Sequence, residues 1–493
     1  MKNDNEQEDA EEIPMKLPEN KTNNNNRNSS RNKSKKFFEK NSFFFIFISL
    51  VIFVMIFLAD NNSSIIELND HINGLRSRVQ YMDKNIVKKK IGVAIVRQYL
   101  IGSYGRFISV LSRFLIETGE FNVYLINEQK TDYDIMYHKK VKREIIKWNL
   151  DEMRNFDEAN DIQIYILLND LSETIELFKS LGKKVVGIFN VEYFSCIYSN
   201  ETEVYRIFKG FSKFDSFVQF VPDDYWIYKK LGFNNTIYIP SLNSFESEKT
   251  QTSKLVNKNI LMVGKFDQGI KGGVYGIYAM AEILKEVPDA KLIIMGFTFP
   301  QPLLDLLKQL KIEKNVDLVG FTQSISHFYL NASVLLVPSI SDSFATIINE
   351  GKAHGLPIVA FDLDYNPSFQ NGVINVDMFN YSLMAKEAVK LLKDYDYRIE
   401  MGKKAKLSLK NNNESFKIWR NLFKSLLNNT DTDKYKELQK EVEKKYYNES
   451  IAKNRLEKHY HYALKYNSFF KCHSFDDFTS LDYINNIKAC PAK

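Results

Sequence analysis

In "VLLVPSISDSFATIINEGKAHGLPIVAF", residues 334–361, two short apolar runs flank a segment of helical character. The first run, at 334–338, has the aliphatic and β-branched composition of a buried strand, and the second follows at 356–361. Between them we expect a helix from about Phe344 to His354, with its cap offered by Ser341 to Ser343. A strand, a helix and a second strand in this order form a crossover unit, which predicts a parallel sheet.

The same alternation fills most of the chain beyond residue 90. The first series of apolar runs lies at 91–96, 121–126, 162–168, 183–189 and 214–220, and a strand "TIYIP" at 236–240 ends it. The second series lies at 259–264, 290–296, 315–321, 333–338 and 356–361. Residues 243–258 are polar and are typical of a linker. We therefore predict an α/β fold with two doubly wound domains, 91–242 and 259–410, that face each other across a cleft.

The N-terminal part of the chain has a different character. Residues 1–42 are rich in Asn, Glu and Lys, which predicts a disordered tail. In residues 43–59, "FFFIFISLVIFVMIFLA", Ser49 is the one polar residue, which favours a single transmembrane helix over a buried core helix or a signal peptide. Basic residues precede this span and acidic residues follow it, so we expect a cytosolic N-terminus and a lumenal catalytic part, in the endoplasmic reticulum or Golgi membrane.

Residues 60–90 are predicted to form a helical stem. Apolar residues from Ile65 to Ile86 recur at alternating spacings of three and four, which is the pattern of a coiled-coil seam. The stem could pair with a second copy to give a homodimer, or lie as one amphipathic helix on its own catalytic domain. At the other end, residues 411–493 are predicted to hold a closing helix and a charged helical extension.

Composition argues against two classes of site. The chain has 67 basic and 61 acidic residues, and no basic stripe with interleaved aromatics, so nucleic acid is not an expected partner. Cys196, Cys472 and Cys490 lie far apart without a Cys-x-x-Cys pair, so no zinc site is expected.

The loop "VGKFDQGIKGG", residues 263–273, carries the first candidate chemistry. A strand ends at Gly264, and Lys265 and Lys271 precede the glycines that open a helix at Gly272. Two ammonium groups and a helix N-terminus would hold a diphosphate well. The alternative is that the lysines are solvated and the glycines only make the turn.

Asp342 and Glu350 lie eight residues apart at the start of the helix expected at 344–354. With a rise of about 1.5 Å per residue, they are separated by roughly 12 Å along the helix. They could therefore contact the two ends of one extended ligand. The backbone N–H groups of Phe344, Ala345 and Thr346 would face phosphates between these ends.

Together these elements resemble the retaining glycosyltransferases of family 4, the glycosyl transferases group 1, which have the GT-B fold of two Rossmann-like domains. The resemblance covers residues 259–428 and is carried by four motifs: Gly264-Lys265, Lys271-Gly272, Asp342-x7-Glu350 and Gly355-Leu356-Pro357-Ile358-Val359. It implies a metal-independent hexosyltransferase without a cofactor. Such an enzyme moves a sugar from a UDP- or GDP-linked donor to a glycan, glycolipid or glycoprotein acceptor, which the first domain would bind.

The resemblance also assigns roles. Lys265 and Lys271 would neutralise the departing diphosphate, Glu350 would accept hydrogen bonds from ribose, and Asp342 would bind the donor sugar. The amides of Phe344, Ala345 and Thr346, together with Gly264 and Gly272, would surround the phosphates. The loop "GSYGR", with Gly102, Ser103 and Gly105, would approach them from the first domain.

Two departures from the family pattern concern activity. Asp342 stands where the family has a glutamate, which shortens the side chain by one methylene. Where the first domain of the family presents a histidine, this chain has Asn190, Val191 and Glu192. The alternative to an enzyme is therefore an inactive GT-B relative that binds glycans or supports another transferase.

Overall fold

The computed structural model describes residues 90–96, 103–127, 139–147, 149–168, 174–188, 193, 210–266, 269–296, 298–322, 324–427, 433–466 and 475. The predicted tail, transmembrane helix and stem lie outside these residues, except for Lys90. Within the described part of the chain, no helix has the length and apolar character needed to cross a membrane. The chain divides into two units, 1–88 and 89–493, and the following description concerns the second.

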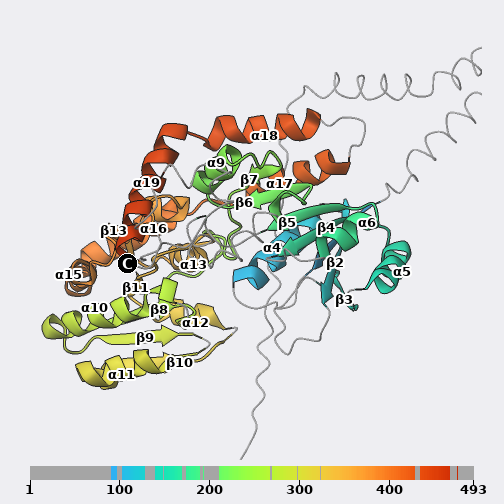
Figure 1. The fold of residues 1–493 in the computed structure, drawn as a ribbon. Helices are drawn as coiled ribbons and strands as arrows, with labels where there is room; N and C mark the ends of the chain where they lie inside the picture. The colour runs from blue at the N-terminus through green and yellow to red at the C-terminus, as the bar shows by residue number, and fades with distance from the viewer. Residues whose placement is uncertain are drawn as a thin grey trace, which may run out of the picture. The chain divides into compact units, whose positions relative to one another are not determined.

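The first domain is built on a seven-stranded parallel sheet with the order β3-β2-β1-β4-β5-β6-β7. Its strands are β1 (Ile91–Val96), β2 (Phe121–Asn127), β3 (Lys142–Ile145), β4 (Ile162–Leu168), β5 (Lys184–Ile188), β6 (Ser216–Gln219) and β7 (Thr236–Tyr238). Its described helices are α4 (Ser103–Glu117), α5 (Leu150–Asn160), α6 (Thr174–Ser180) and α9 (Pro222–Lys230). The order reverses beside β1, as in a doubly wound sheet (Figure 1).

The second domain has a six-stranded parallel sheet with the order β10-β9-β8-β11-β12-β13. Its strands are β8 (Asn259–Val263), β9 (Lys291–Met295), β10 (Val316–Val319), β11 (Val334–Val337), β12 (Ile358–Phe361) and β13 (Ile374–Val376). Its helices are α10 (Gly273–Glu286), α11 (Gln301–Leu310), α12 (Ile325–Leu330), α13 (Thr346–Ala353), α14 (Pro367–Gln370), α15 (Tyr381–Lys393) and α16 (Tyr395–Ser408), with 3₁₀ turns η1 (Gly269–Lys271) and η2 (Glu313–Asn315). The expectation of two parallel α/β sheets is confirmed.

The apolar runs that predicted the strands form the centres of both sheets. All four residues of β11, Val334 to Val337, are fully buried, because helices cover both faces of a parallel sheet. The short strands β3 and β13 did not appear in the predicted series. Both lie at sheet edges, and every residue of β3 is exposed, so neither carries the apolar run that marks a central strand.

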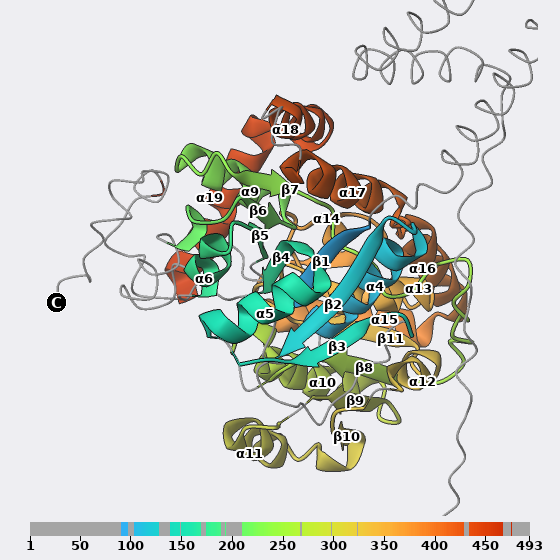
Figure 2. The same cartoon turned by 90° about the vertical axis from the view of Figure 1, so that its right-hand side faces the viewer.

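The C-terminal helices return to the first sheet. Helix α17 (Asn413–Leu427) stacks Phe416 on Phe114 of α4, with ring centroids 4.0 Å apart. Helix α18 (Asp433–Tyr446) lies along β7, where Gln439 donates hydrogen bonds to the carbonyls of Asn234 and Thr236 at 2.9 and 2.6 Å. Helix α19 (Glu449–Tyr466) packs on α9. Both views place α18 close to α9 and β7 (Figures 1 and 2).

The chain therefore passes between the two domains twice, and the two passages are joined to each other. The backbone N–H of Asn243 donates to Oδ1 of Asn412 at 2.8 Å, and Nδ2 of Asn412 donates to the carbonyl of Asn243 at 2.9 Å. Asn412 is buried, so this reciprocal pair replaces water at the crossing point. The pair thus joins the two passages of the chain between the domains.

Candidate active site

The loop between β11 and α13 positions Asp342. Helix α13 begins at Thr346, two residues later than the predicted start near Phe344. The reason is a turn: Oδ1 of Asp342 accepts the backbone N–H of Ala345 at 2.9 Å, and Ala345 takes a left-handed conformation with φ of 46°. The amide of Ala345, expected to face phosphate, is therefore bonded to Asp342.

Lys271 and Asp342, which the sequence analysis placed in one site, lie side by side. Nζ of Lys271 is 3.0 Å from Oδ2 of Asp342, and the Asp342 side chain is 9% exposed. Position 264 adjoins this pair, because a Cβ added to Gly264 would lie 3.5 Å from Cβ of Lys271. Lys265 follows β8 and is exposed.

Gly272 allows the 264–273 loop to approach β11. It caps α10 with φ of 62°, and a Cβ there would lie 1.8 Å from the carbonyl oxygen of Pro338. Only glycine combines this backbone conformation with this contact. The predicted glycine turn is thus the feature that brings the 271 side chain beside Asp342.

Glu350 is buried and both of its carboxylate oxygens have partners. Its side chain is 1% exposed; Oε1 is in an ion pair with NH1 of Arg106, and Oε2 accepts a hydrogen bond from the Tyr329 hydroxyl at 2.8 Å. Burial opposes the charge of Arg106, but the attraction of Glu350 outweighs it, so the pKa of Arg106 is raised. Arg106 therefore stays charged and neutralises Glu350.

Arg106 is a site residue that the sequence did not reveal. It is the last residue of "GSYGR", where the resemblance implies roles only for the glycines and the serine. Ser103 begins α4 and Gly105 lies in its first turn, whereas Gly102 lies outside the described residues. The feature of the sequence that could have indicated Arg106 is a basic residue in the first turn of the helix that follows the first strand.

Phe344 joins the two domains through aromatic contacts. Its ring centroid lies 5.5 Å from those of Tyr104 and Phe107 in α4, and 4.5 Å from that of Phe220 after β6. The residue is 3% exposed. The side chain thus fixes the loop that follows β11 against the first domain.

The end of α13 is fixed by His354. Its Nδ1 lies 2.8 Å from the carbonyl of Glu350, and its Nε2 lies 2.7 Å from Oγ of Ser326 in α12. The ring is fully buried, and this burial lowers its pKa. His354 therefore holds the Glu350 backbone in place.

A second loop, after β12, holds the backbone of Asp342. The Tyr365 hydroxyl accepts the N–H of Asp342 at 3.1 Å. Nδ2 of Asn366 donates to the carbonyls of Asp342 and Ser343 at 2.8 and 3.0 Å. The orientation of Asp342 therefore depends on residues 365 and 366 as well as on its own loop.

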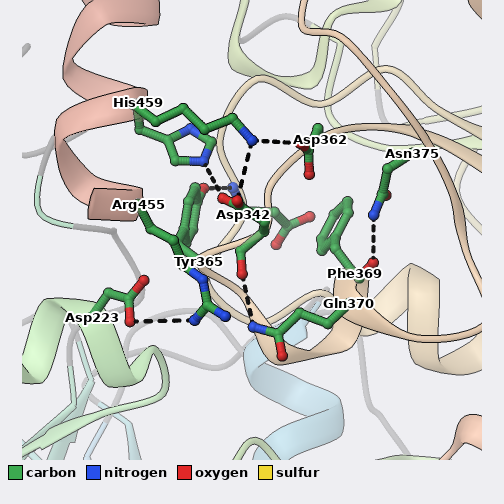
Figure 3. Close-up of polar contacts among 11 residues, drawn as sticks. Asp223, Asp342, Asp362, Tyr365, Phe369, Gln370, Asn375, Arg455 and His459 are labelled. Atoms are coloured by element: carbon green, nitrogen blue, oxygen red, sulfur yellow. Dashed lines mark hydrogen bonds and ion pairs between the residues drawn. The ribbon is translucent and has the colours of Figure 1, made fainter. Parts of the chain in front are cut away.

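Helix α19 contacts this second loop through one face. Lys458 lies 2.5 Å from Asp362 and 3.1 Å from Asp364, and Nε2 of His459 lies 2.9 Å from Oδ1 of Asp364. The His459 ring also meets the Tyr365 ring edge-on at 4.6 Å. Figure 3 shows His459 and Tyr365 adjoining Asp342.

These contacts stabilise charge on the loop. Burial alone would raise the pKa of Asp364, but its hydrogen bonds to His459 and Lys458 lower it overall. The predicted C-terminal extension had no assigned site, and the structure connects it to the loop that orients Asp342. Among the residues that the structure describes, no group of three or more His, Cys, Asp or Glu side chains is arranged to hold a metal ion.

Comparison with known proteins agrees with this geometry. Residues 257–394 match the family described as glycosyl transferases group 1, and over these residues the predicted resemblance to that group is confirmed. An uncharacterized glycosyltransferase of Haemophilus influenzae is 34% identical over 135 residues, 27% of this chain and 38% of that protein. The chain spans less than half the length of each of the first curated relatives that it matches.

Solved structures show the same fold. Sucrose-phosphate synthase from Thermosynechococcus elongatus is 14% identical with a TM-score of 0.59, over 68% of this chain and 99% of that one. Anabaena HepE in complex with UDP and glucose is 12% identical with a TM-score of 0.54, over 68% of this chain and 100% of that one. The chain thus has a GT-B-like fold.

Proposed function

We propose that this protein is a retaining glycosyltransferase that moves a hexose from a nucleotide diphosphate donor to a hydroxyl group of a glycan, glycolipid or glycoprotein. The observation that carries the proposal is the Lys271–Asp342 pair, which lies within the group 1 domain at the carboxyl ends of β8 and β11. Ligands of doubly wound sheets bind at these strand ends. The UDP and glucose named for the Anabaena structure support a nucleotide-sugar donor.

In this proposal the donor separates Lys271 from Asp342 and binds to both side chains. Lys271 turns from Asp342 to the diphosphate, and Lys265 adds a second positive charge. Asp342, freed from Lys271, accepts hydrogen bonds from the hydroxyls of the donor sugar. The bond between the sugar and the β-phosphate breaks, a bond to the acceptor oxygen forms on the same face, and the acceptor proton leaves with the phosphate. The two lysines stabilise the charge that develops on the leaving group.

We also propose that residues 43–59 anchor the enzyme as a single-pass protein of the Golgi or endoplasmic reticulum, with its catalytic domains in the lumen. The support is the apolar span and its flanking charges. Protease treatment of sealed microsomes tests this. Protection of residues 91–430 is expected, and their digestion would place the enzyme on the cytosolic side.

Nucleotide release from a panel of UDP- and GDP-sugars tests the activity of the full-length chain. We expect release with at least one donor, and Lys271→Met to reduce it at least a hundredfold. Lys285→Met is the matched control, because Lys285 is exposed on α10 and pairs with Glu282 in the same helix. Binding of a nucleotide sugar without turnover would favour the inactive relative, and absence of binding by every donor would overturn the proposal.

A further inference from the structure

Helix α19 has two faces, and they contact different domains. Its residues Ala452, Leu456 and Tyr460 are 2%, 1% and 4% exposed and belong to the hydrophobic core cluster of the first domain. They recur every four residues, so they lie on one side of the helix. Tyr462 instead packs against the core cluster of the second domain. The helix therefore contacts both domains.

The first-domain side of α19 is the anchored one. The helix packs on α9, where Arg455 lies 3.7 Å from Oδ1 of Asp223. The other carboxylate oxygen of Asp223 is buried and has no hydrogen-bond partner among the described residues. An apolar face inserted into a core is expected to contribute more to the anchoring than this one long ion pair.

The other side of α19 holds the loop that follows β12. Lys458 contacts the carboxylates of Asp362 and Asp364, and His459 contacts Asp364. Burial opposes the charge of Lys458, but its hydrogen bonds to the two carboxylates outweigh it, so its pKa is raised. The His459 ring is 6% exposed and lies edge-on to Tyr365. Three side-chain contacts and one ring contact thus connect this loop to α19.

The same loop fixes the backbone of Asp342. The N–H of Asp342 donates to the Tyr365 hydroxyl, and its carbonyl accepts from Nδ2 of Asn366. Oδ1 accepts the N–H of Ala345, and Oδ2 lies beside Lys271. The direction of Oδ2 therefore follows from the position of residues 365 and 366. Figure 3 shows His459, Tyr365 and Asp342 in this order of contacts.

We propose that α19 positions Asp342 for the donor sugar, and that Lys458 and His459 are the positioning residues. The inference rests on the proposed transferase function and names the residues that determine sugar recognition in that site. A displacement of about 1 Å in an active site can lower the rate about a hundredfold. Because α19 lies outside the 257–394 match and is anchored on the first domain, recognition of the sugar depends on contact between the domains.

Four variants of the full-length chain separate this role from general stability. Lys458→Met and His459→Phe remove the polar contacts with the loop. Lys458 is 36% exposed, and phenylalanine keeps a ring beside Tyr365, so both variants should fold, which urea unfolding checks. Lys458→Arg keeps the cation and should behave as the unmodified chain. Lys453→Met is the control, because Lys453 is exposed on the same helix.

The first measurement needs no ligand. Hydrogen–deuterium exchange of residues 341–346 reports on the hold of the loop, because the amides of Asp342 and Ala345 are hydrogen-bonded there. We expect exchange about fivefold faster or more in Lys458→Met and His459→Phe. Exchange in Lys458→Arg and Lys453→Met should equal that of the unmodified chain.

The second measurement compares free nucleotides with nucleotide sugars. The probes are UDP with UDP-glucose and GDP with GDP-mannose. In Lys458→Met and His459→Phe, the ratio of the Kd of the nucleotide sugar to that of the nucleotide should rise about fivefold or more. The kcat should fall about tenfold or more. The Kd of the nucleotide itself should stay within about threefold, because Arg106 and Tyr329, rather than α19, hold Glu350.

The outcomes separate the inference from the proposed function. Faster exchange of 341–346, together with no binding or turnover of any nucleotide sugar by the unmodified chain, would refute the transferase and uphold the hold of α19 on Asp342. Unchanged exchange in both Lys458→Met and His459→Phe would overturn the inference at any level of activity. Equal losses of affinity for nucleotide and nucleotide sugar, or the same loss of sugar recognition in Lys458→Arg or Lys453→Met, would also overturn it.

Discussion

Replacement of Arg106 by Met should destabilise the protein strongly, because it leaves the Glu350 carboxylate buried without its cation. Glu350 is 1% exposed, and Tyr329 would remain as its one described partner. Removing one member of a buried ion pair costs about 3–5 kcal/mol. Arg106 is 23% exposed, so water can partly reach the vacated space, and we expect the low end, about 3 kcal/mol.

A double-mutant cycle isolates the pair. Glu350→Gln removes the charge but keeps an oxygen that can accept from Tyr329, so adding it to Arg106→Met should restore about 2 kcal/mol. The assay is urea unfolding of the full-length chain and of each variant. Lys393→Met is the control, because Lys393 and Glu286 form a pair in which both side chains are more than half exposed. It should change the unfolding free energy by less than about 1 kcal/mol.

Two results would refute this reasoning. A loss of under about 1 kcal/mol for Arg106→Met would mean that the ion pair is not buried in solution. Additive losses for Arg106 and Glu350 would mean that the two side chains do not interact.

The same variant tests how the donor enters. If Glu350 binds the ribose, as the resemblance implies, the ribose hydroxyls must replace Arg106, so in Arg106→Met the nucleotide no longer competes with a cation. We expect UDP to bind about tenfold more tightly, which corresponds to about 1.4 kcal/mol. Isothermal titration calorimetry measures this. Weaker binding of UDP would instead show that Arg106 itself contacts the nucleotide.

Three further variants test other parts of the structure. The folded chain holds the pKa of Asp223 at about 7, above its ordinary value of 3.8, so its stability should fall as pH rises from 4 to 7. In urea unfolding at several pH values, Asp223→Asn should remove this pH dependence, which amounts to no more than about 4 kcal/mol of unfolding free energy. An identical slope of unfolding free energy against pH in both proteins would contradict the prediction. Phe344→Ala should cost about 3–5 kcal/mol by losing its aromatic contacts between domains, and faster limited proteolysis would accompany this loss. Gly272→Ala should abolish UDP binding, because its Cβ would overlap the carbonyl of Pro338. Gly320→Ala is the control, because a Cβ added at Gly320 would lie more than 4 Å from other atoms. Equal UDP affinity of the Gly272→Ala and Gly320→Ala variants would contradict the role of Gly272.

Local patterns predicted much of the fold and part of the site. Apolar runs such as that at 334–338 became central strands, because burial on both faces demands continuous apolar sequence. Edge strand β3 escaped prediction because its exposed residues need no such run. Lys271 and Asp342 were placed in one site because each follows a strand end in a short motif, and parallel strands bring their ends together.

Contacts between distant segments could not be predicted in the same way. Arg106 and Glu350 are 244 residues apart, and His459 and Asp364 are 95 apart. The local sequence around a basic residue in a first helical turn is the same whether that residue faces water or an acid. The same holds for three basic residues on a charged helix. Burial is what separates these cases, and burial depends on packing across the whole chain.

By itself, therefore, the sequence determined two parallel sheets and placed Lys271 and Asp342 after strands of the second one, because periodicity and turn chemistry act between near neighbours. The tertiary structure decided which cation neutralises Glu350 and which helix orients the loop beside Asp342. It also decided which carboxylate, Asp223, stays buried without a full set of partners. These features arise where separate segments exclude water from the same polar groups, a condition that no single stretch of sequence contains.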